Sequence, residues 1–231
     1  MSNATLHDPE SVHHAITSRR SVRAFRSDPV DRALLERILA DAARAPSGTN
    51  IQPWTVHVLQ GAARDDLVAK ATERFRSGKG DGLGEYYPSE FVEPYLSRRR
   101  KIGWDMYGLL GIGKGDREAS AAAHCRNFEF FGAPVGLILT MHETMRKGGW
   151  MDLGLYLSNV MALAQAHGLA TCPQAAWLEM ERLLEEELDV PGDHQIVVGL
   201  SIGYEDQTHP LAQLATERAA LDEFVTWHEA K

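Results

Sequence analysis

The chain has 231 residues, of which 44% are hydrophobic and 24% charged, a composition typical of a globular protein built as one domain. Its formal net charge is −8, which argues against general binding to nucleic acid, because such binding takes most of its affinity from a basic surface. Two distant cysteines, Cys125 and Cys172, give neither a disulfide framework nor a zinc motif, and the scattered histidines predict no metal site.

The sequence also carries no signal for a membrane. No apolar run approaches the roughly 18 residues that a spanning helix needs. The polar amino terminus lacks the apolar region of a secretory signal peptide. We therefore expect a cytoplasmic protein with no membrane or nucleic-acid partner.

The first predicted helix covers residues 10–18 and leads into the stretch RRSVRAF, residues 19–25. Three arginines and a serine in seven residues favour a small anion as ligand, because guanidinium groups bind phosphate through forked hydrogen bonds. In an extended segment Arg19, Ser21 and Arg23 share one face, and Arg20 points elsewhere. The alternative is a solvated surface loop.

Residues 32–44 form the second predicted helix, with Asp31 as its N-cap and an apolar stripe at helical spacing. The polar loop PSGTNIQPW follows, and then a predicted strand over 54–60. Amide and hydroxyl side chains in this loop offer both donors and acceptors, which suits the edge of a heterocycle. The alternative is an ordinary turn. The polar side chains concerned are Ser47, Thr49, Asn50 and Gln52.

The middle of the chain predicts an excursion over residues 76–115. A helix over 62–76 ends in a glycine-rich stretch, Gly78 to Gly84, that predicts a mobile surface loop. Helices over 93–110 and 116–130 follow. Trp104 and Tyr107 on the first of them are candidate walls of a substrate pocket, because aromatic rings stack on flat molecules; for Trp104 the alternative is a place in the helix core.

The second half alternates buried strands and helices. Apolar runs predict strands over 133–141 and 196–203, with a short strand or loop over 169–172 that ends at Pro173. A helix over 150–167 is so apolar that we expect it to be central or to lie at a subunit interface. An acidic helix is predicted over 179–188. Residues 208–231 form a polar connection and a C-terminal helix or arm.

Two potentially nucleophilic side chains in this half do not match the context that a catalytic nucleophile requires. Ser201 lies in a G-x-S-x-G pattern, but within an apolar run and before a loop, whereas a nucleophile elbow needs a helix there. Cys172 has no basic neighbour in the sequence, which favours a buried cysteine over a nucleophile.

Taken together, the motifs RRSVRAF, PSGTNIQPW, GLATCPQAAW and GLSIGYED occur in an order that resembles the nitroreductase family of FMN-dependent oxidoreductases. The resemblance runs roughly from Val12 to Trp227. The segments RRRKIGWDMYGLLGIGKGDREAS and NFEFFGAPV are similar to the nitrobenzene and nitrobenzoate reductase branch.

This resemblance implies an α+β fold, an α-β-α sandwich with a mainly antiparallel sheet, formed by one FMN-binding domain over residues 1–231. It implies an intertwined homodimer in which residues 208–231 form an arm over the partner. It also implies that NADH or NADPH reduces the flavin and that a nitroaromatic or quinone-like acceptor oxidises it, by a ping-pong mechanism with flavin N5 as the reactive atom and no catalytic side chain.

The resemblance also assigns residues. The amino-terminal cluster is implied to bind the FMN phosphate, the loop near Asn50 to reach the partner's flavin, and the segment after Cys172 to lie along the ring, while Arg218 closes on the phosphate. The substrate-pocket candidates are Trp104, Tyr107 and Thr49. The implied cofactor-binding residues are Arg19, Arg20, Ser21, Arg23, Pro46, Ser47, Asn50, Gln52, Pro173, Gln174, Ala175, Gly203 and Arg218.

The sequence departs from the family pattern at two places. Many members have a glutamate and a glycine after the proline, where this chain has Gln174, Ala175 and Ala176. Ala212 and Ala215 stand where many members have further phosphate-binding side chains. The preference for NADH or NADPH thus stays open. Two alternative functions also stay open: a dehalogenase or enoate-type reduction on the same scaffold, and a non-catalytic flavin-binding module.

Overall fold

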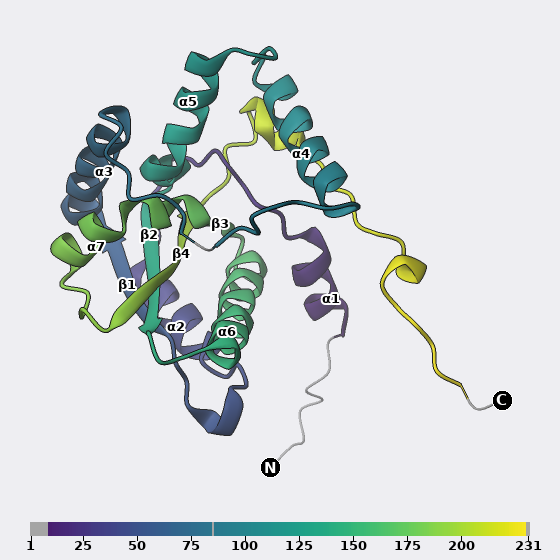
Figure 1. The fold of residues 1–231 in the computed structure, drawn as a ribbon. Coiled ribbons are helices and arrows are strands. Elements are labelled where there is room, and N and C mark those ends of the chain that lie inside the picture. The colour runs from purple at the N-terminus through teal and green to yellow at the C-terminus, as the bar shows by residue number, and fades with distance from the viewer. Residues whose placement is uncertain (1–8, 85, 230–231) are drawn as a thin grey trace.

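The computed structural model describes residues 9–84 and 86–229, and Figure 1 shows a central sheet with helices on both of its faces. The predicted α+β fold with a mainly antiparallel sheet is confirmed. Parts of the predicted domain lie outside the described residues, namely residues 1–8, residue 85 of the excursion and residues 230–231 of the arm.

The elements follow the predicted order. The strands are β1 (Thr55–Gln60), β2 (Val135–His142), β3 (Ala170–Gln174) and β4 (His194–Gly203). The α-helices are α1 (Pro9–Ser18), α2 (Arg32–Ala42), α3 (Gly61–Arg76), α4 (Tyr95–Leu109), α5 (Arg117–Cys125), α6 (Lys147–Ala166) and α7 (Glu181–Leu188). Short 3-10 turns are η1 (Gly48–Asn50), η2 (Arg126–Gly132), η3 (Ala175–Met180), η4 (Pro210–Gln213) and η5 (Leu221–Glu223).

The sheet has the strand order β1-β2-β4-β3, and each neighbouring pair is antiparallel. Strands β2 and β4 are buried on both faces, which explains why their sequences read as continuous apolar runs rather than as alternating ones. The pairing of these two strands shifts register between Leu139 and Thr140. Strand β3 is therefore an edge strand of the described sheet, and its free edge faces the segment that carries the arginines.

Helices α2 and α6 pack on one face of the sheet. The Asp31 side chain accepts a hydrogen bond from the Ala33 backbone N–H at 3.3 Å, which confirms the predicted N-cap of α2. The helical stripe of Leu35 and Ile38 is buried against this face, together with Leu153 and Val160 of α6.

Aromatic side chains cover the other face. Trp177 and Phe130 stack with ring centroids 4.5 Å apart, and both are fully buried. They lie directly over two glycines of the sheet: a Cβ atom built on Gly199 would come within 2.1 Å of Trp177, and one on Gly136 within 2.3 Å of Phe130. Glycine at these two strand positions therefore makes room for the rings.

Several predicted boundaries were wrong. Helix α6 begins at Lys147, before the predicted start at Trp150, and β3 continues through Pro173 to Gln174 because an edge strand tolerates a residue without an N–H. Helix α5 ends at Cys125 and gives way to η2, in which Phe130 and Phe131 have positive φ. The carboxyl-terminal segment contains only the short turns η4 and η5 among its described residues.

Figure 1 shows α4 and α5 standing side by side beyond the sheet, and the yellow carboxyl-terminal segment passing α4 before it runs away from the body. Irregular chain after α3 leads into α4, where the sequence predicts the excursion. None of the helices in residues 9–84 and 86–229 has the length and apolar character needed to cross a bilayer.

Candidate functional site

The arginine-rich segment runs along the free edge of β3. The Val22 N–H donates to the Thr171 carbonyl at 3.0 Å, and Ser21 forms an isolated parallel bridge with Thr171. Because the segment is extended here, its side chains alternate between two faces. Val22 and Ala24 are buried on one face, and Arg19, Ser21 and Arg23 are half-buried on the other.

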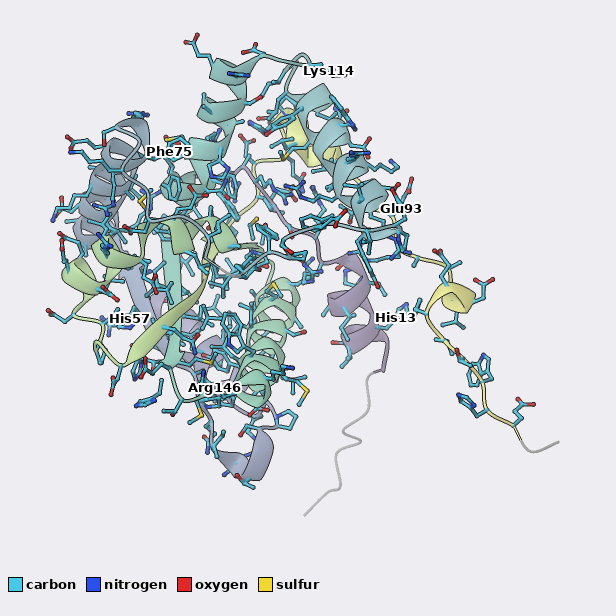
Figure 2. All side chains as sticks on the ribbon, viewed as in Figure 1. His13, His57, Phe75, Glu93, Lys114 and Arg146 are labelled. Atoms are coloured by element: carbon cyan, nitrogen blue, oxygen red, sulfur yellow. The ribbon has the colours of Figure 1, made fainter. Side chains whose placement is uncertain are left out.

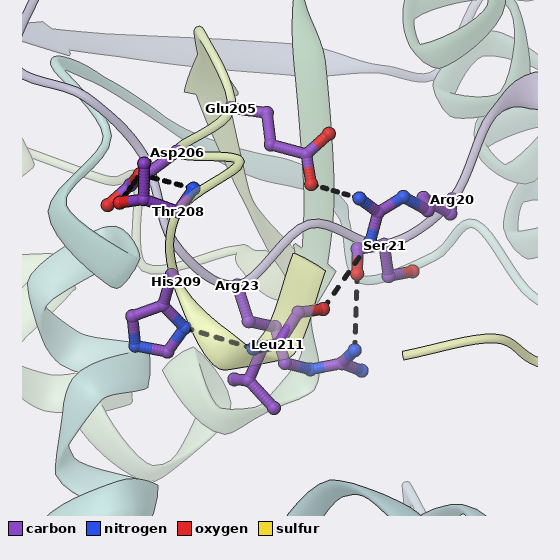
Figure 3. Close-up of polar contacts among 8 residues, drawn as sticks. All are labelled: Arg20, Ser21, Arg23, Glu205, Asp206, Thr208, His209 and Leu211. Atoms are coloured by element: carbon purple, nitrogen blue, oxygen red, sulfur yellow. Dashed lines mark hydrogen bonds and ion pairs between the residues drawn. The ribbon is translucent and has the colours of Figure 1, made fainter. Parts of the chain in front are cut away.

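Arg20 belongs to the opposite face, as predicted, and is already neutralised. Its guanidinium forms an ion pair with Glu205, and it also donates to the Leu211 carbonyl at 3.4 Å (Figure 3). This cation ties the amino-terminal segment to the residues after β4, and its implied contribution to phosphate binding stays a prediction.

Arg19 and Arg23 lack such partners. The Arg23 guanidinium donates only to the Ser21 carbonyl, at 3.2 Å, and among the described residues Arg19 has neither a hydrogen bond nor an ion pair. Half-buried cations without carboxylate partners are able to bind an anion, since a cation held near a low-dielectric surface is stabilised by a counter-charge.

Both arginines act on Cys172. Burial raises the pKa of the Cys172 thiol to about 11, although Arg23 and Arg19 act in the opposite direction. These basic neighbours in space come from another segment, so they could not be seen next to Cys172 in the sequence. Its interpretation as a buried cysteine is confirmed, since only 1% of the residue is exposed.

A cavity of about 380 Å³ opens beside Arg23. It brings together predicted residues that are far apart in the chain: Arg23, Tyr107 of α4 and the segment from Pro173 to Ala175. A second hollow of about 500 Å³ adjoins it and shares Arg23 and Tyr107. The two hollows together are large enough for flat ligands the size of a cofactor ring and a substrate.

Trp104 lines the second hollow. Its side chain is 55% exposed, so the interpretation of Trp104 as part of a helix core was wrong. Helix α4 is only partly covered by the rest of the protein, and its amphipathic pattern is correspondingly weak. Its sequence therefore did not reveal which side of the helix faces the protein.

The side chain of Gln174 points into the protein and does not reach out to a ligand. Its amide N–H donates to the Asn127 carbonyl at 2.6 Å, and its Oε1 accepts from the Ser201 hydroxyl at 2.6 Å. Both side chains are buried. Gln174 thus contributes to the cavity wall while its amide bridges β3, β4 and η2, and the rejection of Ser201 as a nucleophile is confirmed by its complete burial.

We expect Ser201→Ala to lower the free energy of unfolding by about 1–3 kcal/mol, because Gln174 Oε1 would lose its donor inside the core. Urea denaturation measures this, with Ser89→Ala at an exposed position as the control. The hydroxyl should also escape modification by a serine-directed reagent. Covalent labelling at Ser201, or equal stabilities of the two variants, would contradict this role.

The loop from Pro46 to Gln52 lies elsewhere. The Gln52 backbone N–H donates to Ser47 Oγ at 3.0 Å, the Gln52 amide donates to the Asn50 carbonyl at 3.1 Å, and the Gly48 N–H donates to Asp152 of α6 at 3.1 Å. Thr49, Asn50 and Gln52 have positive φ, a conformation that these bonds help to hold. These residues line neither hollow of their own chain.

Two further predicted residues are not brought to the cavity. Gly203 is buried, and a Cβ atom on it would come within 2.6 Å of Pro134 Cδ, so close packing accounts for this glycine. Arg218 donates to the Thr216 hydroxyl at 2.8 Å and lines a separate hollow against α4. In this chain, therefore, Arg218 binds its own segment rather than joining Arg19 and Arg23.

One polar pair in the cavity, His124 and Glu179, was not predicted from the sequence. His124 Nε2 lies 3.0 Å from Glu179 Oε1, and both residues line the same cavity as Arg23. Glu179 thus supplies a carboxylate to a cavity wall in which Gln174 to Ala176 supply none. No group of three or more potential metal ligands occurs within the part of the chain that the structure describes.

Comparisons with known proteins agree with this arrangement. Residues 16–204 match the model of the nitroreductase family. A 4-nitrobenzoate reductase of Pseudomonas putida is 37% identical over 88% of this chain and 89% of its own length. A nitrobenzene nitroreductase of Ectopseudomonas oleovorans is 35% identical over 94% of this chain and 97% of its own. The crystal structure of an FMN and NADPH-dependent nitroreductase, NfnB from Sphigopyxis sp. strain HMH, superposes with a TM-score of 0.90, 37% identity and coverage of 95% and 99% of the two chains.

Proposed function

Since the chain belongs to the nitroreductase family, we propose that it is an FMN-dependent oxidoreductase that passes two electrons from NADH or NADPH to nitroaromatic and quinone-like acceptors. The relatives support this, because one is named a 4-nitrobenzoate reductase and another an FMN and NADPH-dependent nitroreductase. The observation in this chain that carries the proposal is a pair of cations without carboxylate partners among the described residues: Arg23 lines a cavity bounded by Pro173 and Ala175, and Arg19 acts with Arg23 on Cys172 of the same cavity wall.

The residues present fit FMN. Arg19 and Arg23 would bind its phosphate, with the Ser21 hydroxyl as a further donor, because guanidinium groups match phosphate oxygens in charge and geometry. Pro173 and Ala175 would lie along its ring, since they line the adjoining cavity. When bound, FMN supplies the two-electron chemistry, and the protein's task is to hold and orient the reactants.

The chain's own residues then perform three tasks. Arg19 and Arg23 would anchor the phosphate, and the wall formed by Pro173 to Ala175 would position the ring. Leu83, Met106 and Tyr107 line the same cavity and would limit the access of water to it. Reductant and acceptor would occupy the same face in turn, which is the structural basis for a ping-pong sequence. This transfer needs no catalytic side chain, so the proposal assigns no catalytic triad.

We further propose that two chains form the working unit. Large apolar side chains are exposed on α1, on α6 and on the carboxyl-terminal segment: Val12, Ile16, Met151, Leu155, Phe224 and Trp227. The loop with Ser47, Asn50 and Gln52 lines no hollow of its own chain. A second chain would cover the apolar surface and bring this loop to the partner's flavin.

A spectrum of the purified protein tests the function. We expect flavin absorbance that bleaches under anaerobic conditions when NADPH or NADH is added, and that returns when nitrobenzene is added after the nicotinamide has been removed. Separating the two additions tests the ping-pong sequence as well. A protein that binds FMN but is reduced by neither nicotinamide would be a flavin-binding module, and this result would overturn the proposal.

A further inference from the structure

Four consecutive cations on α4, Arg98 to Lys101, fall into two kinds. Arg98 forms an ion pair with Glu223 at 2.9 Å, and Lys101 forms ion pairs with Asp105 at 2.7 Å and Glu217 at 3.3 Å. Arg99 and Arg100 have no carboxylate partner among the described residues; Arg99 lies over the ring of Phe91, 4.7 Å from its centroid. One pair of cations thus holds the carboxyl-terminal segment, and the other pair has no counter-charge.

The unpaired cations gather at one place. Arg99, Arg100 and Lys114 line the hollow of about 500 Å³ that contains Trp104 and Tyr107. Figure 2 shows Lys114 where the chain turns between α4 and α5. None of the described residues that line it is acidic. These three cations are exposed, and a local concentration of positive charge in a chain of net charge −8 attracts anionic ligands to this hollow.

The nearby carboxylates do not fill this need. Asp105 is held by Lys101, and Asp116 caps α5 by accepting from the Ala119 N–H at 3.0 Å. Arg23 also borders the hollow, but it faces the cavity in which we place the flavin. Arg99, Arg100 and Lys114 therefore constitute a basic subsite that adjoins Arg23 and is connected to the flavin cavity through Arg99 and Tyr107.

We propose that this basic subsite binds the carboxylate of an aromatic electron acceptor whose ring lies between Trp104, Tyr107 and the flavin cavity. This inference rests on the proposed function and specifies its substrate class: nitroarenes that carry an acidic substituent. Arg99 borders both hollows, so a ring in the flavin cavity places a ring-bound carboxylate within reach of the subsite. Guanidinium groups bind planar carboxylates through two parallel hydrogen bonds.

The 2′-phosphate of NADPH is a second anionic group that guanidinium side chains in the basic subsite could bind. It is separated from the nicotinamide ring by two sugars and a pyrophosphate, whereas the carboxylate of a nitrobenzoate is attached to the reacting ring itself. A subsite that shares Arg99 and Tyr107 with the flavin cavity fits the shorter separation.

The test compares 4-nitrobenzoate with its neutral methyl ester in steady-state reduction by the holoenzyme. The double variant R99Q/R100Q should lower kcat/KM for 4-nitrobenzoate by about 10- to 100-fold, the loss expected for charge-assisted hydrogen bonds, and leave the ester unchanged. The matched control R98Q/K101Q removes the same charge from the same helix but on the side that contacts the carboxyl-terminal segment. It should keep the preference for the acid.

Binding gives a second readout that does not depend on turnover. Calorimetric titration of each holoenzyme with benzoate should show weaker binding to R99Q/R100Q than to the wild type and the control. Equal binding of benzoate by all three proteins, equal kcat/KM for acid and ester in the wild type, or an effect of R99Q/R100Q confined to the KM for NADPH would overturn the inference. Failure of the proposed function is distinct, because then neither nitroarene is reduced while the calorimetric comparison still decides on the subsite.

Discussion

Replacing Arg19 and Arg23 together with alanine is expected to yield a folded protein that retains little FMN. Each guanidinium offers charge-assisted hydrogen bonds to the phosphate, and neither has a carboxylate partner to compete for it among the described residues. Losing both should raise the Kd of FMN by roughly 100-fold or more. The ratio of flavin to protein absorbance after gel filtration, followed by titration with FMN, measures the change.

A double variant of equal charge provides the control. Arg37 and Arg44 are exposed and line neither of the two hollows, so Arg37→Ala with Arg44→Ala removes the same net charge at a distance from the proposed site. This control should keep wild-type FMN content. If R19A/R23A also keeps it, the phosphate is bound elsewhere, and the assignment of the amino-terminal segment fails.

Truncating Trp177 to alanine should be the most damaging single change to stability. The ring is completely buried, stacks on Phe130 and meets Phe128 edge-on with centroids 5.6 Å apart. Removal of a buried aromatic ring costs about 3–5 kcal/mol in free energy of unfolding. Guanidinium-induced unfolding, at matched protein concentration and saturating FMN, measures it.

The matched control is Trp104→Ala, which removes the same ring from an exposed position on α4 and should change the unfolding free energy by less than about 1 kcal/mol. If Trp177→Ala is no more destabilising than this control, the aromatic layer over Gly136 and Gly199 does not hold the sheet's second face. Because Trp177 follows the Pro173–Ala176 wall directly, we also expect weaker FMN binding by this variant.

Local patterns in the sequence were sufficient to predict most elements. The helical stripe after Asp31 and the apolar runs of β2 and β4 depend on neighbours within a few residues, so their periodicity shows in the chain itself. The role of Gly199 could not be predicted in this way, since the ring that requires a glycine there belongs to Trp177, in a different segment. The continuation of β3 through Pro173 could not be predicted either, because it depends on the position of this strand at the sheet edge.

In the candidate site, too, only the features that depend on local backbone geometry could be predicted from the sequence. Alternation along an extended segment correctly separates Arg20 from Arg19 and Arg23, because it follows from backbone geometry alone. That Glu205 neutralises Arg20, or that His124 meets Glu179, depends on contacts between distant segments. The sequence also could not show that Arg99 and Arg100 lack carboxylate partners. Arg98 and Lys101 beside them carry the same charge but form ion pairs in the structure.

The central claim is that Arg19 and Arg23 recognise a flavin by its phosphate. The most direct measurement is the affinity of the flavin-free protein for FMN and for riboflavin, which differ by that group alone. We predict that FMN binds at least about 100-fold more tightly, as expected for several charge-assisted hydrogen bonds, and that R19A/R23A reduces FMN to the affinity of riboflavin. Equal affinities of the wild-type protein for the two flavins would contradict the account.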